Sequence, residues 1–262
     1  MIRATRALPV ALFLLAPGAL LAQGQGQYPS QESYGIRLEY REWRPTFSGD
    51  VQKGFGDEDG SLVDVVDDLG IEDDRTFEAR GTLQFKQGHK LRGSYTPLDY
   101  KGDVDSAPRD LDYGETEFQR FEHVASSFKG GYYSAAYEYD FLKGPKGFLG
   151  VTLGAKMLDL DTAVVSVDTG RRELDTVRSP LPAIGLVTRA YAGRVSVEGE
   201  VAGMTLGDQG TVVEFDIATR VHLSDRLAAS GGYRYISFKT RDDLYFANLQ
   251  IRGWHFGLEI SL

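Results

Sequence analysis

The chain contains no cysteine, which excludes a disulfide framework, a thiolate zinc site and a cysteine nucleophile. Positive charge is also scarce, with 29 Lys+Arg against 38 Asp+Glu and a formal net charge of −9. This balance argues against a protein that coats nucleic acid. No Walker-type phosphate loop, zinc-protease helix or dinucleotide fingerprint occurs. A length of 262 residues fits one large domain or two small ones.

The N-terminus has the pattern of an export signal. Arg3 and Arg6 precede an apolar run over residues 7–21 that ends in Leu20-Leu21-Ala22, so we predict a cleavable signal peptide over residues 1–22. Residues 23–33 are Gln- and Gly-rich and are predicted to be a flexible leader. After the signal no run approaches the ~20 apolar residues that a spanning helix requires, so any membrane embedding must come from strands.

The hydrophobic pattern of the remaining chain has a period of two, which is typical of strands with two unlike faces. In one segment Phe77, Ala79, Gly81, Leu83 and Phe85 alternate with polar neighbours. The same alternation recurs around residues 34–40, 133–141, 195–201 and 213–221. These segments are long for strands of an ordinary globular protein.

The connections between these segments are short at one end and mostly longer at the other, as in an up-and-down antiparallel β-barrel. We therefore predict an all-β transmembrane barrel of about ten strands over residues 34–262, with eight strands as the alternative. The predicted strands are residues 34–48, 75–86, 90–103, 118–142, 148–165, 179–191, 194–206, 211–223, 227–239 and 244–262. The predicted long connections are residues 50–74, 104–117 and 166–178.

Alternation alone does not decide which face meets water, because a soluble lipocalin-like periplasmic barrel turns its apolar face inward. Aromatic residues near strand ends favour a membrane barrel, since their rings suit the membrane–water interface. The predicted interface aromatics are Tyr34, Tyr133, Tyr139, Tyr191, Trp254 and Phe256. The last strand is apolar on one face up to Leu262 and is predicted to close against the first strand.

With its signal, period-two strands, alternating connections and apolar last strand, the chain resembles the small Gram-negative outer-membrane β-barrel proteins. The resemblance covers residues 34–262 and names no subfamily. Members of this class typically end in Phe, whereas this chain ends in Leu262. The resemblance implies an outer-membrane location, with membrane lipid, lipopolysaccharide and the barrel-assembly machinery as partners and no nucleic acid.

If the apolar face meets lipid, the charged face fills the lumen, and buried charges need partners. We predict a salt-bridge network in which basic and acidic residues are nearly balanced. Its predicted members are Arg37, Glu39, Arg41, Glu78, Arg80, Arg92, Glu138, Asp140, Lys156, Arg189, Arg194, Glu198, Glu200, Glu214, Asp216, Arg220 and Arg234. A barrel of eight to ten strands has a narrow lumen, so the interior is either packed and structural or a narrow path for ions and small polar solutes.

The first long connection carries the signals of a short amphipathic helix. Ser61 and Asp64 have capping-box spacing, and Gly70 suits the position after a helix end. This helix is predicted to cover the barrel mouth or to lie at the membrane surface. Residues 50–74 and 103–117 hold ten and six acids against one base each, and such loops are expected to meet divalent cations at the lipopolysaccharide surface. The twelve-residue calcium-loop pattern is absent.

Some outer-membrane barrels are lipid-modifying enzymes, which need a base held by a partner. Of the four histidines, only His123 falls on the outer half of a predicted strand. Ser127 lies four residues away, or ~13 Å along a strand, so any partner of His123 must come from another strand. The sequence therefore predicts a non-catalytic barrel without a catalytic residue, resident metal or cofactor, and keeps the lipid-modifying enzyme as an alternative.

Overall fold

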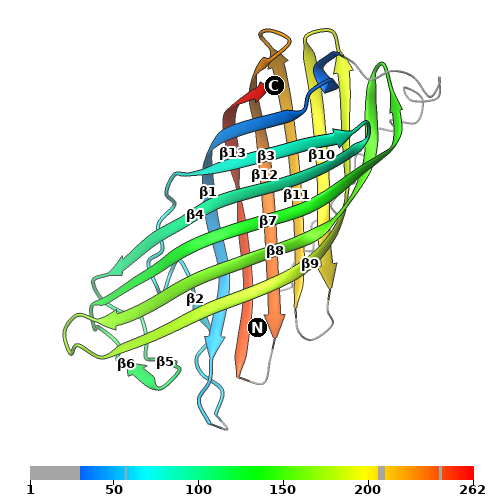
Figure 1. The fold of residues 1–262 in the computed structure, drawn as a ribbon. Helices are drawn as coiled ribbons and strands as arrows, with labels where there is room; N and C mark the ends of the chain where they lie inside the picture. Colours follow the sequence, from blue (N-terminus) through cyan, green and yellow to red (C-terminus); the bar gives the residue numbers. More distant parts are fainter. Residues whose placement is uncertain (1–29, 57, 206–209, 242–243) are drawn as a thin grey trace, which may run out of the picture.

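Ten long antiparallel strands close into one barrel in the computed structural model, which describes residues 30–262 except residue 57, residues 206–209 and residues 242–243 (Figure 1). Each strand pairs with the next, and β13 pairs with β1 from Arg37↔Ser261 to Lys53↔Tyr245. The barrel strands are β1 (Ile36–Lys53), β3 (Thr76–Lys86), β4 (His89–Val104), β7 (Val124–Gly144), β8 (Gly147–Ser166), β9 (Arg172–Ala192), β10 (Val195–Thr205), β11 (Thr211–His222), β12 (Leu227–Arg241) and β13 (Tyr245–Ser261). The predicted ten-stranded up-and-down barrel is confirmed.

Four short elements complete the fold: η1 (Ser30–Glu32), β2 (Val63–Asp64), β5 (Leu111–Tyr113) and β6 (Thr116–Phe118). The strand β2 pairs with β1, and β5 pairs with β6. Within the described parts of the chain, no helix is long and apolar enough to span a membrane. The signal prediction for residues 1–22 lies outside the described residues.

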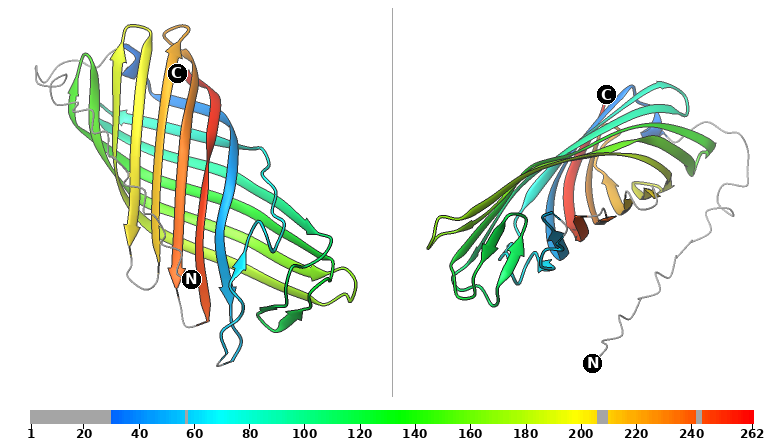
Figure 2. Two further views of the ribbon diagram at one scale, coloured as in Figure 1. Left: turned by 180° about the vertical axis from the view of Figure 1, so that it is seen from behind. Right: turned by 90° about the horizontal axis from the view of Figure 1, so that it is seen from below.

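Short turns join the strands at the end of the barrel that holds the C-terminus, and the longer connections lie at the opposite end (Figures 1 and 2). We call these the turn end and the loop end. The prediction of a long connection over residues 166–178 was wrong, because β8 runs to Ser166 and β9 begins at Arg172. These two strands remain paired up to the loop end, where Val165 lies opposite Arg172.

The helix predicted in residues 61–70 is not present. Val63 and Asp64 instead form an antiparallel pair with Val51 and Asp50 of β1, and the chain then makes a turn that ends at Gly70, where φ is +66°. The side chain of Asp64 caps this turn by accepting hydrogen bonds from the amides of residues 66 and 67. The predicted cap, Ser61, accepts a hydrogen bond from the amide of Asp112 instead.

Along the half of the barrel nearest the turn end, apolar side chains point outward and charged side chains point inward. Outward Leu153 and Ile184 are 65% and 61% exposed, whereas inward Arg220 is 1% exposed. A water-soluble barrel requires the opposite polarity, so the lipocalin-like alternative is wrong for this half. The apolar exterior fits the hydrocarbon of a bilayer.

Nearer the loop end this polarity inverts, as β8 shows. Its outer face changes from Leu153 and Met157 to Asp159 and Asp161, while its inner face changes from Lys156 to apolar residues. A band of outward aromatics marks the change, with ring centroids 5.6 Å apart for Tyr40–Phe77, 6.5 Å for Phe77–Tyr95 and 4.9 Å for Tyr95–Tyr133. Aromatic belts mark membrane–water interfaces, so the barrel beyond this band projects into water.

Four of the six predicted interface aromatics, Tyr133, Tyr139, Trp254 and Phe256, are exposed on the outer face. Tyr34 and Tyr191 depart from the prediction. The ring of Tyr34 is buried 3.8 Å from the guanidinium carbon of Arg37, and the hydroxyl of Tyr191 donates to Glu32 inside the barrel. Tyr34 precedes β1, where the alternation begins, and Tyr191 shares the inward face of β9 with Arg189.

Candidate functional site

The lumen has two layers of opposite chemistry, and the first, the ion-pair layer, fills the half nearest the turn end. Of the predicted charges, only Arg194 lies outside it, exposed in the turn between β9 and β10. The others make ion pairs on the inner face: Arg37, Glu39, Arg41, Glu78, Arg80, Arg92, Glu138, Asp140, Lys156, Arg189, Glu198, Glu200, Glu214, Asp216, Arg220 and Arg234.

Several of these pairs span the lumen and join walls that are not neighbours in the sheet. Arg80 of β3 lies 3.2 Å from Asp216 of β11. Arg92 of β4 lies 2.7 Å from Glu200 of β10, and its other nitrogen donates to Glu138 at 2.9 Å. Paired charges in a low-dielectric interior attract strongly, so these contacts hold opposite walls together across the axis.

Glu32 of η1 enters this layer from outside the strands. Its carboxylate lies 3.2 Å from Arg37, 3.4 Å from Lys90 and 3.3 Å from Arg189, and the side chain is fully buried. Residues 30–32 are therefore held as a 3₁₀ turn inside the turn end, in contrast to the predicted flexible leader. The sequence analysis also missed three further members of the layer, Lys90, His255 and Glu259.

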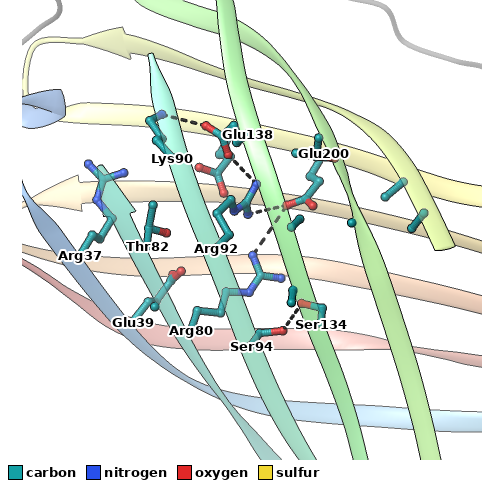
Figure 3. Close-up of a pocket in the computed structure, with 18 of the residues that line it drawn as sticks. Arg37, Glu39, Arg80, Thr82, Lys90, Arg92, Ser94, Ser134, Glu138 and Glu200 are labelled. Atoms are coloured by element: carbon teal, nitrogen blue, oxygen red, sulfur yellow. Dashed lines mark hydrogen bonds and ion pairs between the residues drawn. The ribbon is translucent and has the colours of Figure 1, made fainter. Parts of the chain in front are cut away.

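A polar cavity of about 70 Å³ lies within the ion-pair layer. Figure 3 shows Arg80, Arg92 and Lys90 converging on the carboxylates of Glu138 and Glu200 around it. Its volume has room for a few water molecules, since a cavity of ~10–15 Å³ already holds one. The charged side chains around it form ion pairs with one another, so the cavity is enclosed by the salt-bridge network.

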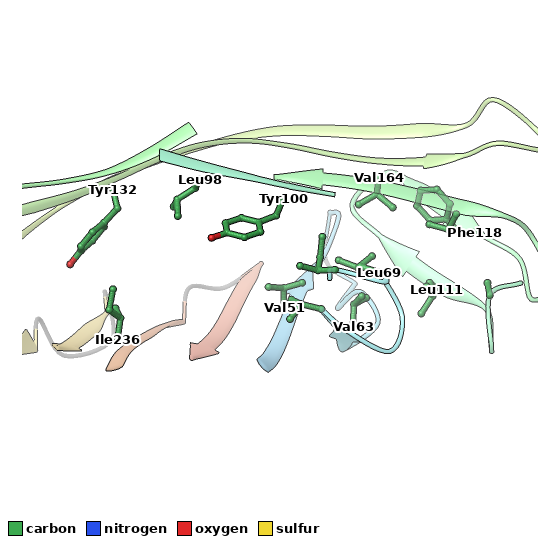
Figure 4. Packing of buried hydrophobic residues seen from close by; sticks show 14 of the residues in the cluster. Val51, Val63, Leu69, Leu98, Tyr100, Leu111, Phe118, Tyr132, Val164 and Ile236 are labelled. Carbon is green, nitrogen blue, oxygen red and sulfur yellow. The ribbon is translucent and has the colours of Figure 1, made fainter. Parts of the chain in front are cut away.

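The second layer, the apolar layer, occupies the lumen toward the loop end. Figure 4 shows Leu98, Tyr100 and Tyr132 facing Ile236, with Val63 and Leu69 packed beyond them. A cavity of about 80 Å³ lies in this layer. It is lined by Trp43, Phe47, Val65, Ile71, Leu98, Tyr100, Phe128, Tyr132, Leu158, Leu160, Leu181, Val212, Ile236, Phe238, Leu249 and Ile251, with Lys156 as the single charged neighbour.

The boundary between the two layers is formed by Trp43 and Tyr132, which contact charged residues of the ion-pair layer. The guanidinium carbon of Arg234 lies 5.1 Å from the ring centre of Trp43 and 5.7 Å from that of Tyr132. Tyr132 donates to Glu214 at 3.1 Å, and Lys156 also bonds Glu214. Cation–π contacts of this kind favour charge over an aromatic face, so the aromatic rings separate the apolar cavity from the charges below it.

The two acidic segments meet above the apolar layer. The amide of Ser61 donates to the carbonyl of Asp112, and Arg109 pairs with Asp68 at 2.6 Å. Lys53, at the tip of β1, lies 2.7 Å from Glu173 and 3.2 Å from Asp175 of β9. The Lys53 pairs fasten β9 to β1 at the loop end, and the other contacts join the two acidic segments to each other.

No protein-family model matches the sequence, and no curated protein sequence matches it. Among solved structures, the outer-membrane protease OmpT from Escherichia coli matches with a TM-score of 0.59 and 7% identity over 87% of this chain and 96% of that one. The protein has the outer-membrane β-barrel fold. The translocator domain of the autotransporter NalP from Neisseria meningitidis also matches, with a TM-score of 0.47 and 12% identity over 88% of this chain and 90% of that one. At these identities the likeness concerns the fold alone.

At the loop end of the barrel, His123 lies just before β7 instead of on the predicted strand. Its partner comes from another strand, as its spacing from Ser127 requires. Its Nε2 lies 2.8 Å from a carboxylate oxygen of Asp103 on β4, and its amide donates to Asp168. A carboxylate of Asp105 also lies close, with the three ligand-type atoms within 4.8 Å of one another. The hydrogen bond that the ring donates to the Asp103 carboxylate raises the pKa of His123 above its ordinary value.

We expect the substitution Asp103→Asn to lower the pKa of His123 toward that of an ordinary histidine. Because the folded-state pKa is raised, the ion pair stabilises the fold fully below the unfolded pKa and loses this effect as pH rises through the folded pKa. A histidine NMR titration in micelles measures the shift, with His123→Ala assigning the signal. Asp99→Asn, on an exposed outward position of the same strand, is the matched control, and equal His123 titrations in both variants would refute the pairing.

Proposed function

We propose that the protein resides in the outer membrane of a Gram-negative cell as a closed barrel that does not conduct along its axis, with a structural role. The observation that carries this proposal is the set of ion pairs across the lumen, Arg80–Asp216 and Arg92–Glu200 above all. These pairs join opposite walls across the lumen, and the acidic and basic side chains there neutralise each other's charge. An axial path for polar solutes would have to separate them.

The energy of that separation supports a closed state. Removing the partner of a buried ion pair typically costs about 3–5 kcal/mol, and a path along the axis would disrupt several pairs together. The next layer toward the loop end is apolar, so an ion that passed the charges would then lose its hydration without gaining ligands. Both layers therefore oppose permeation, and they do so by independent physical effects.

We expect the folded full-length protein to give no single-channel steps in a planar lipid bilayer. A large porin reconstituted in the same membrane is the positive control for the assay. Heat-modifiable gel migration of the same sample shows whether the inserted protein is folded, which separates a closed barrel from a failed reconstitution. Discrete conductance steps from the folded wild-type protein would overturn the closed-barrel proposal in favour of a narrow channel.

A lipid-modifying enzyme is the weaker candidate. The imidazole of His123 bonds the carboxylate of Asp103, whereas nucleophilic catalysis needs a hydroxyl or activated water against the base. The nearby hydroxyl of Ser126 is buried and donates to the carbonyl of Leu69. These contacts favour a structural ion pair at His123.

A further inference from the structure

We infer that the apolar layer is a binding site for a neutral hydrocarbon ligand. This inference goes beyond the closed-barrel role and does not depend on conductance. The first observation is the cavity of about 80 Å³ among Trp43, Leu98, Leu158 and Ile236. Apolar cavities of this kind stay dry and take up small apolar molecules, so the space suits a short hydrocarbon segment.

The second observation is that the surface of this cavity is apolar throughout. The residues that line it are aliphatic or aromatic apart from Lys156, and no polar atom of theirs opens onto the space. An ion or a polar solute would lose its hydration there without gaining a hydrogen-bond partner. The lining therefore favours a neutral hydrocarbon over a polar ligand.

The third observation is a break in the strand pairing at the height of the cavity. The described pairing of β9 with β10 starts at Ile184, and Leu181 lies just beyond it on β9. Leu181 lines the cavity. The apolar layer therefore adjoins a break in the sheet close to the aromatic band, where a hydrocarbon chain can approach from the membrane interface.

The two tryptophans of the chain make the inference testable. Trp43 lines the cavity and is 2% exposed, whereas Trp254 is 61% exposed on the outer face. In a Trp254→Phe background, Trp43 is the sole tryptophan reporter. We expect 1-bromodecane, titrated into the folded protein in micelles, to quench its emission with a saturable curve, because bromine quenches a tryptophan that it contacts.

Neighbouring positions on β11 supply a matched pair of variants in this background. Val212→Phe places a ring in the cavity, whereas Val213→Phe places the same ring on the exposed face. We expect Val212→Phe to abolish the saturable quenching and Val213→Phe to retain it. Ile236→Phe, also at the cavity, replaces Val212→Phe if that variant does not fold by heat-modifiable migration.

A second arm separates the two sources of hydrocarbon. Vesicles with brominated acyl chains replace 1-bromodecane, and saturable quenching there assigns the site to membrane lipid, whereas quenching by 1-bromodecane alone assigns it to free hydrocarbons. Quenching that never saturates, or that is equal in Val212→Phe and Val213→Phe, would overturn the inference. Neither result bears on conductance, so failure of the binding site and failure of the closed barrel are distinguishable.

Discussion

Replacing Arg220 with Ala is expected to lower the free energy of unfolding by about 3–5 kcal/mol, the range measured when one partner of a buried ion pair is removed. Arg220 is 1% exposed on β11. It lies 3.2 Å from Glu39, 3.2 Å from Glu198 and 2.8 Å from Glu259, which belong to three other strands. The substitution leaves three neighbouring carboxylates without this cation, so their mutual repulsion adds to the loss of the pairs.

The midpoint and slope of urea unfolding in micelles, followed by tryptophan emission, give this free energy. Arg178→Ala is the control, because Arg178 also pairs with a carboxylate, Asp159 at 3.2 Å, but its side chain is 73% exposed. Exposed pairs contribute about 0–1 kcal/mol. If the two variants lose similar stability, the ion-pair layer does not provide the stabilisation that its burial implies.

Replacing Leu153 with Arg is expected to cost about 2–4 kcal/mol in a bilayer, the range for a cation at the midplane of a barrel's lipid face. Leu153 is 65% exposed and lies on β8 six residues from the first residue of the strand, Gly147. At 3.3 Å per residue and a tilt near 45°, it lies ~14 Å above the turn end. That height is about the middle of an apolar band ~25 Å tall.

Leu174→Arg isolates the effect of height. Leu174 is also an outward leucine, 58% exposed, but it lies beyond the aromatic band on β9, opposite Ala163. There we expect a cost of about 0–1 kcal/mol, as near an interface. Unfolding of both variants by urea in lipid vesicles supplies the comparison. Equal costs would contradict the placement of the lipid boundary at Tyr95 and Tyr133.

The period of two predicted the fold because a barrel wall is built from strands whose two faces meet different solvents. The strand count followed from Gly and polar residues at the tight turns, such as Gly88 and Gly193, which both have positive φ.

The helix predicted in residues 61–70 does not form, because long-range contacts outweigh its local signals. The local signals at Ser61 and Asp64 were real, but pairing with β1 and the contact with Asp112 are long-range and leave no trace in the local sequence.

The period of two predicts most of the luminal charges, but only for residues that lie on strands. Parity along each strand placed Arg80, Glu214 and their neighbours on the inner face, and parity applied to the last strand would also have found Glu259. Glu32 precedes the first strand, so no period could reveal it. The apolar layer was not predicted, because the sequence argument assumed that lipid surrounds the whole length of the barrel. The exterior instead changes from lipid to water along Leu153, Met157 and Asp159 of β8.

The closing pair of strands has a consequence for the order of folding. Arg37 and Ser261, hydrogen-bonded across the β1–β13 seam, are separated by 224 residues in sequence, and Arg41 finds Asp216 across 175 residues. Contacts of such high sequence separation form late, since the entropy of closing the intervening chain must be lost first. Arg37 and Arg41 therefore gain these long-range partners only when the last strands reach the first strand. Completion of the charged interior and closure of the wall are expected to be one kinetic event.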